Sequence, residues 1–232
     1  QSLFIRGKID RIDLLETEKG YHLGIVDYKS SAQKFDINRL RYGIQLQLLT
    51  YLSVARNIVS DQFKKTVTPY GGLYMHVFQP SFNAKDLKSD ANFEETRLKK
   101  YKLSGLLTND LGVLQQVQPN FEAGDSIVLP FGVKKDGEYK ATSQVYTPDD
   151  INLLMDFAFY QLKTAGERIL NGENQIAPFD ELKEYADSVN GKFSAISMFD
   201  ATNPENNYQF LTKMPLQENL TWMRNKIDGK EE

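Results

Sequence analysis

A carboxylate and an amine stand together at the end of an apolar run, at Asp27 and Lys29 in the segment YHLGIVDYK (residues 21–29). Side chains two residues apart on a β-strand point to the same face, so both would share the face of the apolar residues before them. A buried carboxylate is costly unless it is paired or bound to a metal. Acidic-x-Lys tripeptides also occur at 86–88, 181–183 and 228–230. The tripeptide alone is therefore weak evidence, and its place on a hydrophobic strand is what indicates a site.

A second carboxylate, Asp10, lies on the preceding predicted strand, residues 3–13. The polar segment that ends at Gly20 predicts a hairpin between the two strands. With a two-residue turn, Asp10 falls opposite Asp27, their Cβ atoms about 5 Å apart. A three-residue turn shifts the register by one. Two carboxylates that close repel each other, and Mg²⁺, typically held by one or two carboxylates with several waters retained, would relieve the repulsion.

This arrangement suits the hydrolysis of a phosphodiester. Such a reaction needs a metal that polarises the phosphoryl oxygen and lowers the pKa of a bound water. It also needs a cation near the developing negative charge, a part that Lys29 could take. A cross-strand cluster of ion pairs among Asp10, Arg11, Asp27 and Lys29 is an equally good interpretation of the geometry.

Two polar residues on a predicted helix could reach the hairpin. A long helix is predicted over residues 39–59, with Asp36 or Asn38 as its N-cap. Gln47 and Tyr51 are four residues apart and therefore lie on one face of it. The alternative is that Tyr51 is an ordinary core residue with a satisfied hydroxyl group.

The remaining pattern predicts further strands and helices, which together indicate an α/β or α+β layered domain. We expect a central mixed sheet opened by the hairpin 3–29, with the helix 39–59 packed on one face. The other predicted elements are a strand over 70–79, a helix around 92–101, a short strand near Ile127 and helices over 148–170 and 216–226.

The composition excludes several kinds of chemistry. The 232 residues include no cysteine and two histidines, which excludes disulfides, thiolate metal sites and a cysteine nucleophile. No apolar run approaches the roughly 20 residues of a membrane helix, and no phosphate-binding glycine loop is present. The net charge of −3 means that contact with DNA would be local or shared with a partner. A basic run at residues 99–102 could touch phosphates, but a solvated helix face is the better interpretation.

The motifs resemble a known family. Four parts of the chain resemble the RecB-type nuclease motifs: the segments 7–13, 25–31 and 42–43, and Gln47-x-x-x-Tyr51. Within that group they are most similar to the motifs of AddB/RexB-type subunits of bacterial ATP-dependent helicase/deoxyribonucleases. The resemblance is dense over residues 5–52 and thinner to about residue 215. It implies an α/β fold with a PD-(D/E)xK restriction-endonuclease-like core, in which helices flank a central mixed sheet.

The resemblance also implies roles for individual residues. Asp10 and Asp27 would bind the metal with the main-chain carbonyl of Tyr28, and Lys29 would be the catalytic lysine. Gln47 and Tyr51 would support the site and the DNA strand. The implied cofactor is Mg²⁺, for which Mn²⁺ may substitute. The implied partners are DNA and a helicase–nuclease subunit of the AddA/RexA type. The implied activity is that of a cytoplasmic exonuclease in double-strand-break repair. A DNA-binding or subunit-docking platform of the same fold, without cleavage, is the alternative function.

Two features depart from the family. Its further metal-binding histidine lies on a helix upstream of the first strand, and neither His22 nor His76 fits that place. Its Fe–S cluster uses cysteines that the matching stretch, about Ser188 to Ser197, does not contain, so no Fe–S cluster is expected. We expect a nuclease core over 1–180, truncated at its N-terminal side, and a C-terminal tail over 181–232. That tail would replace the cluster region and hold by packing alone.

Overall fold

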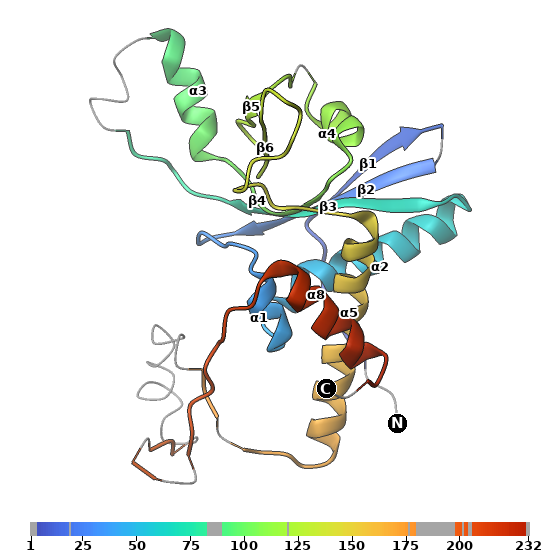
Figure 1. Ribbon diagram of the computed structural model, residues 1–232, viewed down its shortest axis with the longest axis vertical. Coiled ribbons are helices and arrows are strands. Elements are labelled where there is room, and N and C mark those ends of the chain that lie inside the picture. The colour runs from blue at the N-terminus through green and yellow to red at the C-terminus, as the bar shows by residue number, and fades with distance from the viewer. Residues whose placement is uncertain are drawn as a thin grey trace. The chain divides into compact units, whose positions relative to one another are not determined.

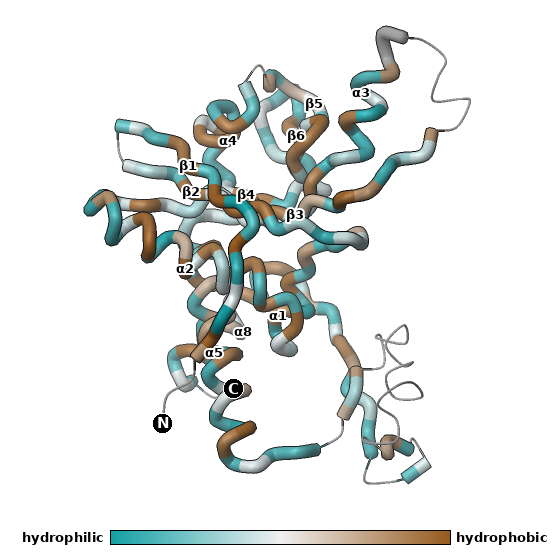
Figure 2. The backbone as a smooth tube through the Cα atoms, turned by 180° about the vertical axis from the view of Figure 1, so that it is seen from behind, coloured by the Kyte–Doolittle hydropathy of each residue, from teal (hydrophilic) through white to brown (hydrophobic). Residues whose placement is uncertain are grey.

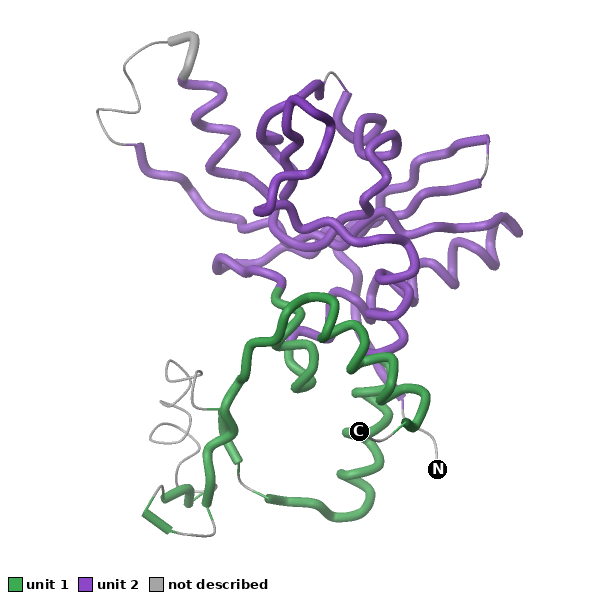
Figure 3. The backbone as a smooth tube through the Cα atoms, in the orientation of Figure 1, with its two compact units in different colours: residues 1–3, 36–44, 159–232 green, residues 4–35, 45–158 purple. Residues whose placement is uncertain are grey.

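The computed structural model describes residues 4–18, 20–82, 90–119, 121–175, 177–179, 198–200, 202–203 and 206–230. The chain forms two compact units (Figure 3). The sheet unit comprises Phe4–Phe35 and Gln45–Ala158, and the helical unit comprises Asp36–Ile44 and Phe159–Glu232 together with the first three residues. Every residue predicted to form the site lies in the sheet unit.

A five-stranded mixed sheet forms the centre of the sheet unit (Figure 1). Its order is β1-β2-β3-β4-β7, with strands β1 (Arg11–Thr17), β2 (Gly20–Lys29), β3 (Val67–His76), β4 (Ser104–Thr108) and β7 (Val145–Tyr146). The pair β2–β3 and the pair β4–β7 are parallel, whereas β1–β2 and β3–β4 are antiparallel. The expected α/β fold with a central mixed sheet is confirmed.

The hairpin at the start of the sheet has the predicted register, but its first strand lies later in the chain. Thr17 pairs with Gly20, which leaves two residues in the turn. The predicted strand 3–13 is wrong, because the ladder begins at Arg11, opposite Val26. Residues 4–9 have no strand partner in the described chain, and Gly7 among them approaches Tyr51 of α2. The polar residues assigned to the turn extend β1 to Thr17, because this strand lies at the edge of the sheet.

The predicted helix 39–59 is two helices, α1 (Ile37–Arg41) and α2 (Leu46–Phe63). Asp36 caps α1 as expected, accepting a hydrogen bond from the Asn38 main-chain N–H at 2.9 Å. The chain then breaks at Gly43 (φ +76°), a left-handed conformation that suits glycine and ends helices. The apolar spacing runs on through this break, which is why the sequence pattern concealed it.

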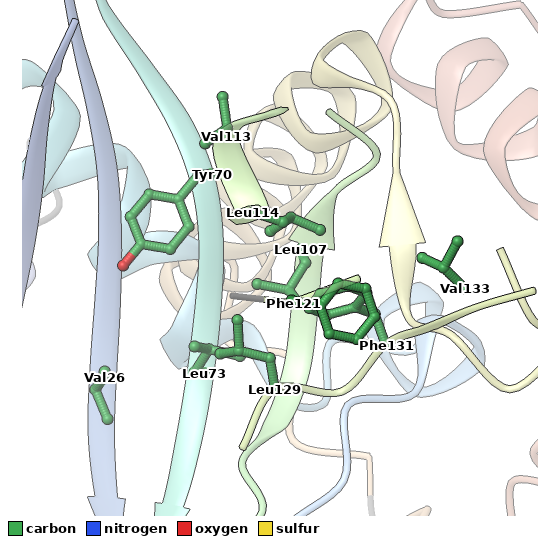
Figure 4. Close-up of a cluster of buried hydrophobic side chains, with 10 residues drawn as sticks. All are labelled: Val26, Tyr70, Leu73, Leu107, Val113, Leu114, Phe121, Leu129, Phe131 and Val133. Atoms are coloured by element: carbon green, nitrogen blue, oxygen red, sulfur yellow. The ribbon is translucent and has the colours of Figure 1, made fainter. Parts of the chain in front are cut away.

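Helix α2 covers one face of the sheet and packs against β2 and β3. The opposite face is covered by α3 (Asp90–Lys100), α4 (Leu111–Val117) and the two-stranded sheet of β5 (Gly124–Asp125) and β6 (Gly132–Val133) (Figure 1). Ten buried side chains join α4, β6 and the segments next to them to the central sheet (Figure 4). They are Val26, Tyr70, Leu73, Leu107, Val113, Leu114, Phe121, Leu129, Phe131 and Val133.

Sequence patterns did not find β4 or α4, and the strand predicted near Ile127 is wrong. The short strands here are β5 and β6, and Ile127 lies between them. These elements are only two to seven residues long. Such short segments carry too few residues for a period of 2 or 3.6 to be recognised.

The helices predicted over 148–170 and 216–226 are present as α5 (Pro148–Leu170) and α8 (Leu216–Ile227). Figure 2 shows polar and apolar residues alternating along the helices. Within the part of the chain that the structure describes, none of the helices has the length and apolar character to cross a membrane.

Within the helical unit, side chains of α1 and its flanking residues form hydrogen bonds with the segment from Thr212 to Asn219. The expectation that packing alone stabilises the C-terminal tail is therefore wrong. The buried guanidinium of Arg41 donates to the carbonyl oxygen of Thr212 at 2.6 Å and to its hydroxyl group at 2.7 Å. The amide of Asn219 donates to Asn38 at 2.8 Å. The stretch 188–197 lies outside the described residues, and the boundary near residue 180 remains a prediction.

Candidate active site

Strand β2 carries Asp27 and Lys29 on one face of the sheet, as its alternation predicts. Leu23 and Ile25, on the same face, are completely buried beneath α2. Asp27 continues this row and is only 4% exposed, whereas the Lys29 side chain is about a quarter exposed. The Lys29 ammonium lies 2.7 Å from Asp27 Oδ2. The strand therefore ends in a buried carboxylate whose neighbouring cation reaches solvent.

The buried carboxylate of Asp27 is incompletely satisfied. Its Oδ2 atom is paired with the Lys29 ammonium at 2.7 Å and has no other hydrogen-bond partner among the described residues. Burying a charged oxygen without full compensation costs on the order of several kcal/mol. The arrangement therefore favours a further cation beside Asp27.

Helix α2 brings Gln47 and Tyr51 to this pair. Lys29 Nζ donates to Gln47 Oε1 at 2.6 Å, and Gln47 Nε2 donates to the Tyr51 hydroxyl group at 3.1 Å. The two helix residues are four apart, so the spacing that placed them on one face also lets them join one another. Asp27, Lys29, Gln47 and Tyr51 thus form one continuous polar chain. The hydrogen bond from Gln47 to the Tyr51 hydroxyl group places Tyr51 in this polar chain rather than simply in the core.

Asp10 lies one residue before β1, where continuation of the register places it opposite Asp27. Its Oδ2 atom accepts a hydrogen bond from the Tyr28 main-chain N–H at 3.0 Å. This contact fixes the Asp10 carboxylate beside the end of β2. That Asp10, Asp27 and the Tyr28 carbonyl share one ion remains a prediction.

The alternative ion-pair cluster of four residues does not form. Arg11 binds Asp13 at 2.7 Å, and this pair lies on the opposite face of the sheet, where Val26 points. Lys29 is therefore the partner of Asp27, and Arg11 takes no part in this contact.

The site includes a close approach that sequence reasoning missed. A Cβ atom built on Gly7 would lie 2.8 Å from Tyr51 Cε1 and 2.9 Å from its hydroxyl oxygen. The chain leading to Asp10 therefore passes flush against the Tyr51 ring. Gly7 was recognised only as part of a motif, because nothing in its local sequence shows which side chain it meets.

Tyr74 is a second neighbour that the sequence did not identify. It pairs with Asp27 across the parallel β2–β3 ladder, and the Lys29 ammonium lies 5.9 Å from the centre of its ring. Burial, and secondarily the charge of Asp27, raises the pKa of Tyr74 to about 12. Tyr74 is therefore a neutral phenol at physiological pH. The alternation of β3 could have placed it on this face, but the pairing of β3 with β2 is not visible in the sequence.

The residues present are suited to a hard divalent cation. Asp10 and Asp27 supply carboxylate oxygens and the Tyr28 carbonyl can supply a third, the oxygen ligands that Mg²⁺ prefers. The observation that supports this fit is the buried Asp27 Oδ2 atom, whose single partner among the described residues is the Lys29 ammonium. Within the described ranges, no group of three or more His, Cys, Asp or Glu side chains could hold a metal. An ion here would keep several of its waters.

Comparison with known proteins relates this geometry to a family. The model of the PD-(D/E)XK nuclease superfamily matches residues 2–182. The proteins named as B subunits of ATP-dependent helicase/deoxyribonucleases in Bacillus thuringiensis (strain Al Hakam), Bacillus anthracis and Bacillus mycoides (strain KBAB4) are each 32% identical to the chain over 226 residues. The match covers 97% of this chain but 19% of each relative. The chain therefore spans about a fifth of the length of these relatives.

Proposed function

Because the chain belongs to the PD-(D/E)XK nuclease superfamily, we propose that it is the metal-dependent deoxyribonuclease domain of a helicase–nuclease subunit. It would act as an exonuclease on DNA during double-strand-break repair in the cytoplasm, together with a helicase–nuclease subunit of the AddA/RexA type. The names of the relatives support this assignment. The net charge of −3 also favours a shared DNA channel, because an acidic domain has little affinity for phosphates by itself.

Asp10, Asp27 and the Tyr28 carbonyl would hold Mg²⁺, or Mn²⁺ in its place. The metal supplies an activated water and polarises the phosphoryl group. Lys29 would place its ammonium beside the negative charge that develops on the phosphate. Gln47 would orient that ammonium through their 2.6 Å hydrogen bond, and Tyr51 would hold Gln47 in turn.

The observation that carries this proposal is the Asp27–Lys29 pair at the solvent end of a buried row. Apart from the Lys29 ammonium at 2.7 Å, Asp27 Oδ2 has no partner among the described residues, and this supports a second cation beside it. An incompletely satisfied buried carboxylate beside an accessible amine is the arrangement expected of a metal-assisted site.

The test is Asp27→Ala in the full-length subunit assembled with its helicase partner, with degradation of end-labelled linear DNA measured in Mg²⁺. Asp13→Ala is the matched control, because it removes a hairpin carboxylate from the opposite face. We expect Asp27→Ala to reduce cleavage of the DNA strand that this domain cuts at least about 100-fold. We expect Asp13→Ala to retain cleavage of that strand.

Cleavage at the wild-type rate by the Asp27→Ala complex would refute the assignment. The alternative function, a platform that binds without cutting, predicts a different result. In that case the wild-type complex binds DNA, but its degradation of this strand does not depend on Asp27, Lys29 or added Mg²⁺.

A further inference from the structure

The ring of Tyr74 lies beside the Asp27–Lys29 pair. Tyr74 is the direct partner of Asp27 on the parallel β2–β3 ladder, so the two residues stand side by side on strands roughly 5 Å apart. The Lys29 ammonium lies over the Tyr74 ring, 5.9 Å from its centre. The candidate catalytic lysine therefore faces an aromatic ring in addition to Asp27 and Gln47.

Little water reaches this contact. Tyr74 is 5% exposed, and Asp27 beside it is 4% exposed. A cation over an aromatic face is attracted by the negative charge of that face, and the attraction grows when the two groups are desolvated. Because burial raises the pKa of Tyr74 to about 12, the ring acts as a neutral phenol and attracts the ammonium through its face.

An aromatic face attracts the ammonium without accepting one of its N–H groups. The ammonium of a lysine carries three of them. One donates to Gln47 Oε1 at 2.6 Å, and the ion pair with Asp27 Oδ2 at 2.7 Å uses a second. The third has no acceptor among the described residues. The contact with Tyr74 therefore leaves one N–H group for a phosphate oxygen.

The ring also lies on the side of Asp27 that faces away from Asp10. Strand β2 runs between β1 and β3. Asp10 reaches the end of β2 from the β1 side, where it accepts the Tyr28 main-chain N–H, whereas Tyr74 comes from β3. An ammonium held over the ring is thus kept apart from the place where the two carboxylates would share a metal.

We propose that Tyr74 is a positioning residue for Lys29. Its ring holds the ammonium on the β3 side of Asp27, with one N–H group left for the phosphate and the β1 side left for the metal. This inference rests on the proposed nuclease function and adds a residue that aligns the lysine of that site.

The first test measures cleavage kinetics of the full-length subunit assembled with its helicase partner in Mg²⁺. Tyr74→Leu should lower kcat roughly 2- to 30-fold, the range for one lost cation–ring contact, with little change in KM. Tyr74→Phe keeps the ring face and should restore kcat to within about 2-fold of the wild type.

Fluorinated phenylalanines at position 74 separate the charge of the ring face from its shape. The 4-fluoro, 3,5-difluoro and 3,4,5-trifluoro forms withdraw electrons from the face stepwise and keep nearly the same volume. We expect kcat to fall with each step, from the Tyr74→Phe value toward the Tyr74→Leu value. The same series at Tyr70 is the matched control and should leave kcat within about 2-fold. Tyr70 is 3% exposed on β3 but belongs to the core on the opposite face.

A second readout does not involve cleavage. It is the NMR resonance of the Lys29 ε-methylene protons in the 232-residue chain without metal, identified by its loss in Lys29→Arg. An aromatic ring shifts nuclei above its face upfield. The resonance should therefore move downfield in Tyr74→Leu and stay near its wild-type position in Tyr74→Phe.

The outcomes distinguish this inference from the proposed function. If cleavage depends on Asp27 but kcat is the same throughout the fluorinated series at position 74, Tyr74 does not position Lys29 and the nuclease assignment stands. A rise in KM with unchanged kcat in Tyr74→Leu, or an unmoved Lys29 resonance, would also overturn the inference. A moved resonance without Asp27-dependent cleavage would support the placement of Lys29 by Tyr74 and refute the nuclease assignment.

Discussion

Replacing Gly7 with alanine tests whether Tyr51 holds the chain that leads to Asp10. The new Cβ atom would lie 2.8 Å from Tyr51 Cε1 and 3.2 Å from Cζ. Carbon atoms in favourable contact are about 3.5 to 4.0 Å apart. Either the ring or the chain must therefore move back by roughly 0.7 Å.

A movement of this size would propagate to Lys29. The Tyr51 hydroxyl group accepts the Gln47 amide at 3.1 Å, close to the upper end of the normal range, so a small shift breaks this bond. Gln47 would then hold Lys29 less firmly. Misplacement of a reacting group by about 1 Å can reduce a rate by about 100-fold, and overpacking costs about 1–3 kcal/mol. We expect Gly7→Ala to slow cleavage by about 10- to 100-fold.

The assay measures initial rates on end-labelled DNA in Mg²⁺ with the assembled subunit, and the free energy of unfolding by urea titration. Gly112→Ala is the matched control, because Gly112 is exposed on α4 and its Cβ atom would meet Asp110 Oδ1, the N-cap of that helix, at 3.3 Å and no atom of Tyr51. This control should change the rate by less than about 2-fold, since a surface substitution away from such features costs under about 0.5 kcal/mol.

A double-mutant cycle shows whether the effect passes through the ring. Tyr51→Ala removes the atoms that the new Cβ would meet, so adding Gly7→Ala to this variant should cause no further loss of rate. Residues in contact are expected to be non-additive in this way. The reasoning is wrong if Gly7→Ala lowers the rate by the same factor in both backgrounds, or leaves the wild-type rate unchanged.

Three further predictions follow from the described contacts. Burial raises the pKa of Tyr74 from 10.0 to about 12, so the free energy of unfolding should fall as pH rises between about 10 and 12. In urea titrations, Tyr74→Phe should remove roughly 2–3 kcal/mol of that fall. Identical pH profiles for the variant and the wild type would contradict this prediction. Arg41→Leu should destabilise the chain by about 1–3 kcal/mol and speed proteolysis before α8, whereas an unchanged digestion rate would show that its bonds to Thr212 are dispensable. Calorimetry of the isolated chain should find Mg²⁺ binding weaker than micromolar, because two carboxylates and a carbonyl hold the ion loosely; micromolar affinity would indicate a further ligand.

The site could be predicted from sequence where local geometry decided it. Asp27 and Lys29 share a face because a strand has a period of two, and Gln47 meets Tyr51 because a helix brings residues four apart together. The opposition of Asp10 and Asp27 required only a two-residue turn. Each of these inferences used fewer than twenty residues of contiguous chain.

Other parts of the site depend on contacts between distant segments. Tyr74 and His76 reach Asp27 and Lys29 through the parallel pairing of β3 with β2, and no local pattern fixes which strands will pair in parallel. The approach of Gly7 to Tyr51 depends in the same way on where α2 packs. The helix break at Gly43 was missed because the apolar spacing continues through it.

The sequence by itself determined the strand that carries Asp27 and Lys29 and the helix face of Gln47 and Tyr51, whereas the hairpin register was left open between two turn lengths. These follow from backbone periods that are the same in every protein. Only the tertiary structure decided the hairpin register, the binding of Lys29 to Gln47, and the place of Tyr74 beside Lys29. Those properties depend on burial and on distances between elements, which packing sets and which a linear pattern does not encode.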